Sequence, residues 1–292
     1  TLRLLEEKEG ELRQKGPVLE RLGDIKNIVG EYDACTKYWS EALLLWKQLQ
    51  EKGNISRLHR KMANVLWESI GDTEKAKEHH EAALKILEKE PESVELASLY
   101  EDMAHMYYRI GEIAKALPWA EKALELAKKL NDYEVIASSY ASLGTVFSYA
   151  GEKKKAIECL EKALKITLDN GYFERALRAY NNLSAVLPEE ENERRLECLE
   201  KGFELAKKVG DIRMVSFIGT NLAWGYIDMG NMNKALRLVE ESVALDRRAG
   251  NMINLCFSLG VLGFANQIFG ELDKSEQYYK EVFSTASKTN DF

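Results

Sequence analysis

The chain has 292 residues, of which 45% are apolar and 30% charged, and its formal net charge is −7. This apolar content excludes a disordered chain. The negative charge and the lack of a basic patch argue against nucleic acid as a direct ligand, because phosphate contacts need clustered Lys and Arg. We find no uninterrupted apolar run of about 18 residues, so the sequence predicts no membrane span.

From its beginning the chain shows a helical pattern that returns about every 40 residues. Residues 2–14 are interpreted as the second helix of a truncated preceding repeat, which would occupy residues 1–16. Seven repeats are expected after it. Their predicted bounds are 17–54, 55–93, 94–132, 133–171, 172–211, 212–251 and 252–292.

A glycine marks the middle of most repeats. It ends one helix and is followed by an acid or amide that can begin the next, because Gly tolerates the left-handed C-cap conformation. These glycines are Gly30, Gly71, Gly111, Gly151, Gly230 and Gly270. Large apolar residues recur before the turn, and small residues such as Ala116 and Ala156 recur after it. Each repeat is therefore predicted to be a helical hairpin that buries its apolar stripes only by stacking on its neighbours.

The segment YASLGTVFSYAGEKKKAIECLEKAL, residues 140–164, carries the clearest resemblance to a known family. It is similar to tetratricopeptide repeats, in a variant of about 40 residues with long helices. Tyr140, Leu143, Gly144, Phe147, Gly151, Ala156, Leu160 and Ala163 occupy the family's signature places. The resemblance implies an all-α fold, a right-handed α-solenoid superhelix of about seven hairpins with a concave inner face.

The fifth repeat departs from this pattern. Pro188 stands where the first helix should continue and is expected to end that helix near Leu187. The usual glycine turn is replaced by residues 189–192, and Arg195 stands at a small-residue place. Two interpretations stay open: drift in a tolerant loop, or a hinge or docking turn.

Candidate binding residues are predicted on the concave face, which the first helices of the family's hairpins line. The amino-terminal half of that face is expected to be polar and the carboxy-terminal half aromatic, and an apolar patch with a polar rim often marks a binding site. The candidate residues are Tyr108, Arg178, Asn181, Phe217, Trp224, Ile227, Phe257 and Phe264. The alternative is that these side chains pack inside the array or against further repeats.

One binding mode of the family is disfavoured. Repeats that clamp chaperone carboxyl termini use Lys and Asn at fixed places, and here Lys61 is present. Val65 replaces the Asn, however, and Glu101 replaces the next basic residue.

The sequence contains no catalytic or phosphate-binding motif of the common kinds, so no enzyme activity, catalytic residue or cofactor is predicted. His79 and His80 are adjacent and point in different directions on a helix, so no metal site is predicted. Four dispersed cysteines indicate a reducing, cytoplasmic location. They are Cys35, Cys159, Cys198 and Cys256.

The spacing, the turns between hairpins and the lack of catalytic motifs resemble the sensor regions of signal-transduction ATPases with numerous domains (the STAND class), including maltose-type transcriptional activators. The resemblance implies a protein, peptide or small-molecule inducer on the concave face and an attached NTPase module as partners. We also expect the chain to be part of a larger protein, because residues 290–292 repeat a junction between hairpins. A constitutive adaptor resembling kinesin light chains, or a peptide receptor that inhibits response regulators, are the alternatives.

Overall fold

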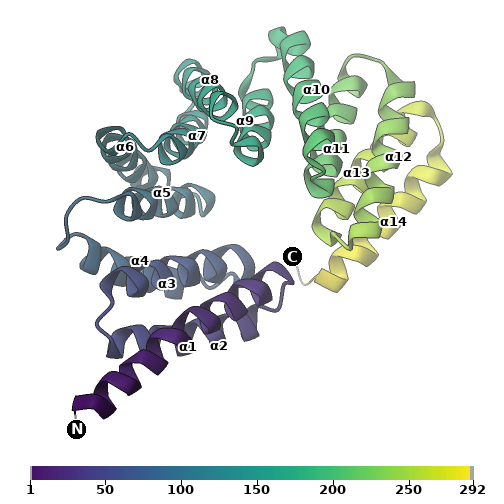
Figure 1. Ribbon diagram of the computed structural model, residues 1–292. Helices are drawn as coiled ribbons and strands as arrows, with labels where there is room; N and C mark the ends of the chain where they lie inside the picture. The colour runs from purple at the N-terminus through teal and green to yellow at the C-terminus, as the bar shows by residue number, and fades with distance from the viewer. Residues whose placement is uncertain (1, 290–292) are drawn as a thin grey trace. The chain divides into compact units, whose positions relative to one another are not determined.

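The computed structural model describes the backbone of residues 2–289 and the side chains of residues 10 and 12–287 (Figure 1). These residues form fourteen α-helices, a π-helical turn and a 3-10 turn, and contain no strand. The bounds are α1 Leu2–Ile28, α2 Tyr32–Gln48, α3 Lys52–Val65, η1 Leu66–Ile70, α4 Thr73–Leu87, α5 Val94–Arg109, α6 Ile113–Leu130, α7 Tyr133–Tyr149, α8 Lys153–Asp169, α9 Phe173–Val186, η2 Glu189–Glu191, α10 Asn192–Val209, α11 Ile212–Asp228, α12 Met232–Ala249, α13 Met252–Phe269 and α14 Leu272–Thr289. The expected junction at residues 290–292 lies outside the described residues.

The helices form two compact units, residues 1–146 and 147–292, and α7 spans the boundary between them. In the first unit α1 packs on α2, α3 on α4 and α5 on α6. In the second unit the corresponding pairs are α9 with α10, α11 with α12 and α13 with α14 (Figure 1). Successive pairs also contact each other, as α12 does with α13. The expected all-helical class, an α-solenoid of stacked hairpins, is confirmed.

The glycine turns have the predicted geometry. Gly151 has a φ of 78°, in the left-handed region that favours glycine, and the N–H of Glu152 donates to the carbonyl of Phe147 across the turn. Between hairpins, the side chain of Asp211 accepts from the N–H of Met214 and caps α11. Local sequence thus fixes where these helices begin and end.

Small residues after the turn lie where two helices approach each other closely. Cys35, Ala76, Ala116, Ala156 and Ala235 are completely buried. A larger side chain at these places would push the paired helices apart, which explains the recurring small residue. Cys35 behaves as part of the core, and burial raises the pKa of its thiol to about 11.

The start of the chain differs from the expectation. No helix ends before residue 17, because α1 runs without a break through Gly16 and Pro17. The structure gives Gly16 another role: a Cβ atom there would lie 2.5 Å from Cζ2 of Trp46 on α2. This glycine allows a tryptophan ring to approach α1 closely.

The irregular fifth repeat is as predicted at Pro188. α9 ends at Val186, and buried Leu187 is followed by Pro188 and the short turn η2. Because Pro has no N–H and clashes with the preceding turn, the helix cannot continue. The second helix, α10, then starts afresh at Asn192.

Although α13 contains no uninterrupted apolar run, it is apolar over its whole length. Met252–Phe269 has a mean hydropathy of 1.5 and no charged residue, so by length and composition this helix could cross a membrane. In the structure α13 contacts both α12 and α14, and Leu259, Val261 and Leu262 lie in the core that these helices share. Because helices pack against α13 on more than one side, its apolar composition is that expected of a core helix.

Candidate functional site

Two aromatic pairs join α11 to α13 in the second unit. Phe217 and Phe257 have ring centroids 6.1 Å apart, and Trp224 and Phe264 are stacked with centroids 5.0 Å apart and an interplanar angle of 15°. Phe217 and Trp224 are seven residues apart, as are Phe257 and Phe264, so each helix presents both rings on one face about 10 Å apart. We call these four side chains the aromatic surface.

The aromatic surface is only partly covered. Trp224 is 39% exposed and Phe257 is 41% exposed, while Phe217 and Phe264 are half-buried. Gly260 lies between the two rings of α13, and a Cβ atom there would meet nothing within 4 Å. Large rings beside open space are unusual for a core, so four of the predicted residues do form one accessible apolar surface.

An amide pair adjoins the aromatic surface. The side chain of Asn221 on α11 donates to the Asn181 side-chain oxygen on α9 at 2.7 Å. Asn221 lies one turn from Phe217 and one turn from Trp224, so the amides lie on the same side of α11 as the rings. Each amide keeps hydrogen-bonding capacity beyond this bond. Arg178, also on α9, is exposed.

Two of the predicted residues do not join this surface. Ile227 is buried in the core formed with α12 and α13, so its prediction as a surface contact was wrong. It lies one turn beyond Trp224, where residues of α12 and α13 cover the helix. Tyr108 belongs to the first unit, where its ring tilts against that of His105 with centroids 5.1 Å apart.

A buried polar cluster underlies the aromatic surface. Asp246 on α12 accepts a hydrogen bond from Ser258 on α13 at 2.7 Å, and Ser258 contacts the hydroxyl of Thr220 on α11 at 2.9 Å. All three side chains are buried. Burial raises the pKa of the Asp246 carboxyl, against the smaller effect of the nearby Ser216 and Ser258 hydroxyls.

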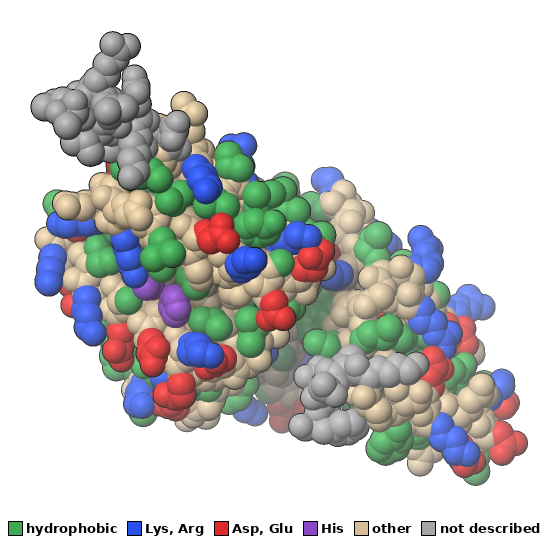
Figure 2. Space-filling view, turned by 90° about the horizontal axis from the view of Figure 1, so that it is seen from below, with side chains coloured by type: hydrophobic (Ala, Val, Ile, Leu, Met, Phe, Trp, Pro, Cys, Tyr) green, Lys and Arg blue, Asp and Glu red, His purple; other side chains and the backbone are tan. Residues whose placement is uncertain are grey.

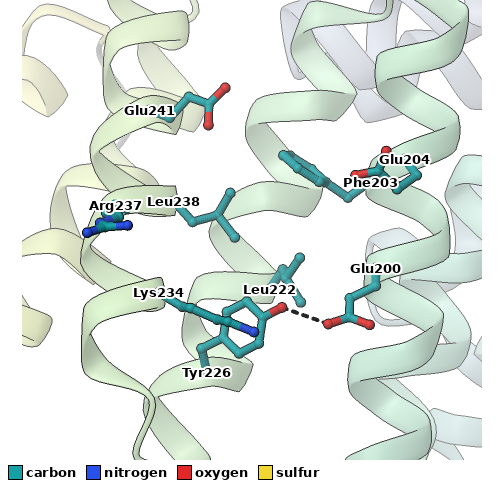
Figure 3. A pocket seen from close by; sticks show the side chains of 9 residues that line it. All are labelled: Glu200, Phe203, Glu204, Leu222, Tyr226, Lys234, Arg237, Leu238 and Glu241. Atoms are coloured by element: carbon teal, nitrogen blue, oxygen red, sulfur yellow. Dashed lines mark hydrogen bonds between the residues drawn. The ribbon is translucent and has the colours of Figure 1, made fainter.

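A pocket of about 480 Å³ lies elsewhere on the second unit, between α10 and α12 and over α11 (Figure 3). In this view Leu238 and Phe203 point toward each other from opposite sides, and Leu222 and Tyr226 lie below them. Tyr226 donates to Glu200 at 2.7 Å, and burial together with this bond raises the pKa of Tyr226 to about 12. Lys234 lies over the Tyr226 ring, 5.2 Å from its centroid. These polar groups are therefore already engaged within the chain.

The first unit uses ion pairs where the second uses aromatic rings. Arg57 donates two hydrogen bonds to Glu20, and Lys61 bridges Glu20 and Asp24, which joins α3 to α1. Lys61 is thus bound within the chain, in agreement with the argument against a carboxylate clamp. Farther along, Arg60 pairs with half-buried Asp102 on α5.

Two histidines lie close together, a contact that no local sequence pattern predicts. Nδ1 of His59 on α3 and Nδ1 of His79 on α4 are 3.0 Å apart. Within the described residues, however, no three His, Cys, Asp or Glu side chains gather in a way that could hold a metal ion. On the face seen in Figure 2, acidic and basic side chains alternate with apolar ones, and no large patch of one charge stands out.

A family model described as tetratricopeptide repeat matches residues 16–89 and 95–169, about half of the chain. The chain belongs to the tetratricopeptide repeat family. No curated protein sequence matches it.

Several solved structures share the fold at low sequence identity. Aspartyl phosphate phosphatase F from Bacillus subtilis has a TM-score of 0.74 and 12% identity, over 96% of this chain and 72% of that one. The Rap conjugation gene regulator of plasmid pLS20, in complex with the Phr* peptide, gives 0.70 and 17%, over 95% and 75%. A signal-transduction ATPase with numerous domains and a tetratricopeptide repeat sensor, from Pyrococcus horikoshii, gives 0.69 and 18%, over 94% of this chain and only 42% of that one.

Proposed function

We propose that this chain is a non-catalytic binding region whose aromatic surface takes an apolar segment of a peptide or protein. The observation that carries the proposal is the pairing of Trp224 with Phe264 and of Phe217 with Phe257, in rings that remain partly exposed. Exposed aromatic residues of this size supply much of the energy at protein interfaces. Exposure of these rings to water is unfavourable in the unbound chain, and a bound ligand would cover them.

The chemistry of the surface defines the ligand class. Two ring pairs about 10 Å apart fit two apolar side chains that are separated by a few residues. Asn181 and Asn221 can bond the peptide backbone between them, since amides both donate and accept. The residues that form or adjoin the aromatic surface carry no charge. They are Phe217, Thr220, Asn221, Trp224, Phe257, Gly260 and Phe264. We therefore expect an uncharged apolar segment, with Arg178 available to an acidic group at one end.

Within this class, we propose the ligand-sensing region of a cytoplasmic STAND-type ATPase or transcriptional regulator, in which binding relieves inhibition of an attached NTPase module. The fold shared with the sensor-bearing protein from Pyrococcus horikoshii supports this choice. Two alternatives share the same surface. One is a peptide receptor resembling the Rap regulator solved with Phr*, and the other is a constitutive adaptor. An NTPase module in the full-length gene would favour the sensor, and a gene that lacks one would exclude it.

Binding can be tested with an array of immobilised peptides of varied sequence. The wild-type chain should retain peptides with two apolar residues, and Trp224→Ala with Phe264→Ala should weaken their binding by 10-fold or more, as truncated aromatic anchors usually do. The matched control is Tyr149→Ala, which removes an exposed ring on α7 outside this surface. Equal binding by the wild type and the double variant would refute the proposed site.

A further inference from the structure

Asp246 is a buried carboxyl group without a cation. It is 1% exposed, and its Oδ1 atom has no hydrogen-bond partner among the described residues. Among the described residues, the groups that affect its pKa are the hydroxyls of Ser216 on α11 and Ser258 on α13, and no charged side chain is among them. A carboxylate buried in this way loses its hydration with little compensation, at a cost of several kcal/mol.

Asp246 also breaks the repeat pattern. Its place, eleven residues after the small residue that follows the glycine turn, is apolar or small in the other repeats. The corresponding residues are Trp46, Leu87, Ala127, Thr167 and Ala206. A charged residue at a core position calls for an explanation beyond packing, because an apolar residue would be more stable there.

Three contacts in a row lead from Asp246 to α11. Oδ2 of Asp246 is 2.7 Å from Ser258 Oγ, Ser258 Oγ is 2.9 Å from Thr220 Oγ1, and Thr220 Oγ1 is 3.0 Å from the Ser216 carbonyl oxygen. Each hydroxyl has one proton to donate. The number of protons available therefore decides whether all three contacts can be hydrogen bonds at once.

An ionised Asp246 leaves this row one proton short. The carboxylate can only accept, so Ser258 donates to it, and Thr220 then has one proton for two acceptors. With a proton on Oδ2, Asp246 donates to Ser258, Ser258 donates to Thr220, and Thr220 donates to the Ser216 carbonyl. All three contacts can therefore be hydrogen bonds at once only if Asp246 is protonated. This state is favoured because buried polar groups normally have all their hydrogen bonds.

We propose that Asp246 carries a proton in the folded chain near neutral pH, and that this proton positions the aromatic surface through Ser258 and Thr220. Thr220 lies between Phe217 and Trp224 on α11, and Ser258 directly follows Phe257 on α13. The row of bonds therefore fixes how α11 and α13 lie against each other beneath the rings. Asp246 is a positioning residue, and its relevance to a ligand, though not its protonation, rests on the proposed function.

The pH dependence follows from the direction of the pKa shift. Burial raises the pKa of Asp246 above the ordinary value of about 4, so the folded state keeps a proton that the unfolded chain releases. For a carboxyl group shifted upward, the stabilising proton is present at low pH and is lost as pH rises through the folded-state pKa. Raising the pH should therefore loosen the contact between α11 and α13.

Infrared spectroscopy of the intact chain tests the protonation directly. At pH 6, where an ordinary Asp is ionised, the wild type should show a stronger C=O stretch of buried carboxylic acid than Asp246→Asn. Asp102, whose pKa burial raises to about 7, contributes to both spectra, so Asp102→Asn should keep a band that the variant with both substitutions lacks. Detection of Asp246 as a carboxylate at this pH would overturn the inference. Because the spectrum is recorded without ligand, this result is independent of whether peptides bind the aromatic surface.

Urea unfolding between pH 6 and pH 8 tests the positioning role. Asp246→Asn keeps a neutral side chain that can donate to Ser258, so its unfolding midpoint and its Trp emission should change less with pH than those of the wild type. The matched control is Glu241→Gln, an exposed carboxylate on the same helix, which should keep the wild-type profile. A wild-type profile in Asp246→Asn would contradict the inference. If that variant does not fold, the infrared spectrum of Asp102→Asn decides the case, because a carboxylic-acid band at pH 6 should remain after Asp102 is replaced.

Discussion

Gly16 and Trp46 show how a single hydrogen atom in place of a methyl group sets the distance between two helices. The Trp46 ring is only 4% exposed, so it cannot move away from a Cβ atom placed 2.5 Å from it. We predict that Gly16→Ala lowers the free energy of unfolding by about 1–3 kcal/mol, the usual effect of overpacking.

The matched control for this prediction is Gly10→Ala, on the same helix. A Cβ atom at Gly10 meets nothing within 4 Å, so the substitution should raise helix stability by up to about 1 kcal/mol. Urea unfolding of both variants measures the difference. Two variants of equal stability would show that Gly16 does not make room for the ring.

The positions and contacts of individual side chains were harder to predict from sequence than any other feature of the candidate site. The column pattern identified Phe217, Trp224, Phe257 and Phe264, because aromatic residues at helical spacing share a face. The same pattern misplaced Ile227, because residues of α12 and α13 cover this part of the helix face, which the spacing within α11 does not reveal. The roles of Asn221 and Asp246 depend on hydrogen bonds to residues 40 and 12 positions away in the sequence. No local sequence pattern predicts such contacts.

At the scale of elements, α3 and α4 hold three histidines in a neutral state. Burial lowers the pKa of His59 to about 4 and of His80 to about 3, and that of His79 is lowered as well. His80 is completely buried, with no hydrogen-bond partner at either ring nitrogen among the described residues. The unfolded chain binds protons at these residues below about pH 6.5, so their contribution to stability is lost as pH falls.

We therefore predict that His80→Leu, which places an apolar residue in this apolar site, reduces the loss of stability between pH 7 and pH 5. Asp102 acts in the opposite direction, because burial raises its pKa to about 7. The useful quantity is thus the difference between variant and wild type at each pH, measured by urea unfolding. The same loss in both chains would mean that His80 is not held neutral by burial.

Helix boundaries were more predictable than contacts between helices. Gly151 and Asp211 act within a few residues of themselves, so their roles at helix ends follow from the sequence. Pro188 likewise ends α9 by local chemistry. The link from Arg57 and Lys61 to Glu20 depends on which faces of α1 and α3 meet, and that was not evident before the helices were stacked.

At the scale of the whole molecule, repetition made the fold class predictable. One hairpin pattern recurs along the chain, and every copy needs neighbours to bury its apolar stripes. Function does not follow in the same way, since tetratricopeptide repeats with one architecture bind many partners. What distinguishes this chain is where its copies differ: ion pairs join first helices in one unit, and aromatic pairs join them in the other.

The central claim is that the rings of α11 and α13 form a binding surface and are not part of the core. Urea unfolding of the double variant Trp224→Ala with Phe264→Ala, compared with Leu259→Ala, tests it most directly. Leu259 is completely buried on α13, and its truncation should cost about 2–5 kcal/mol. The account predicts that the double variant stays folded, with a smaller loss than Leu259→Ala, and no longer retains peptides. A double variant that loses as much stability as Leu259→Ala, or unfolds, would contradict it.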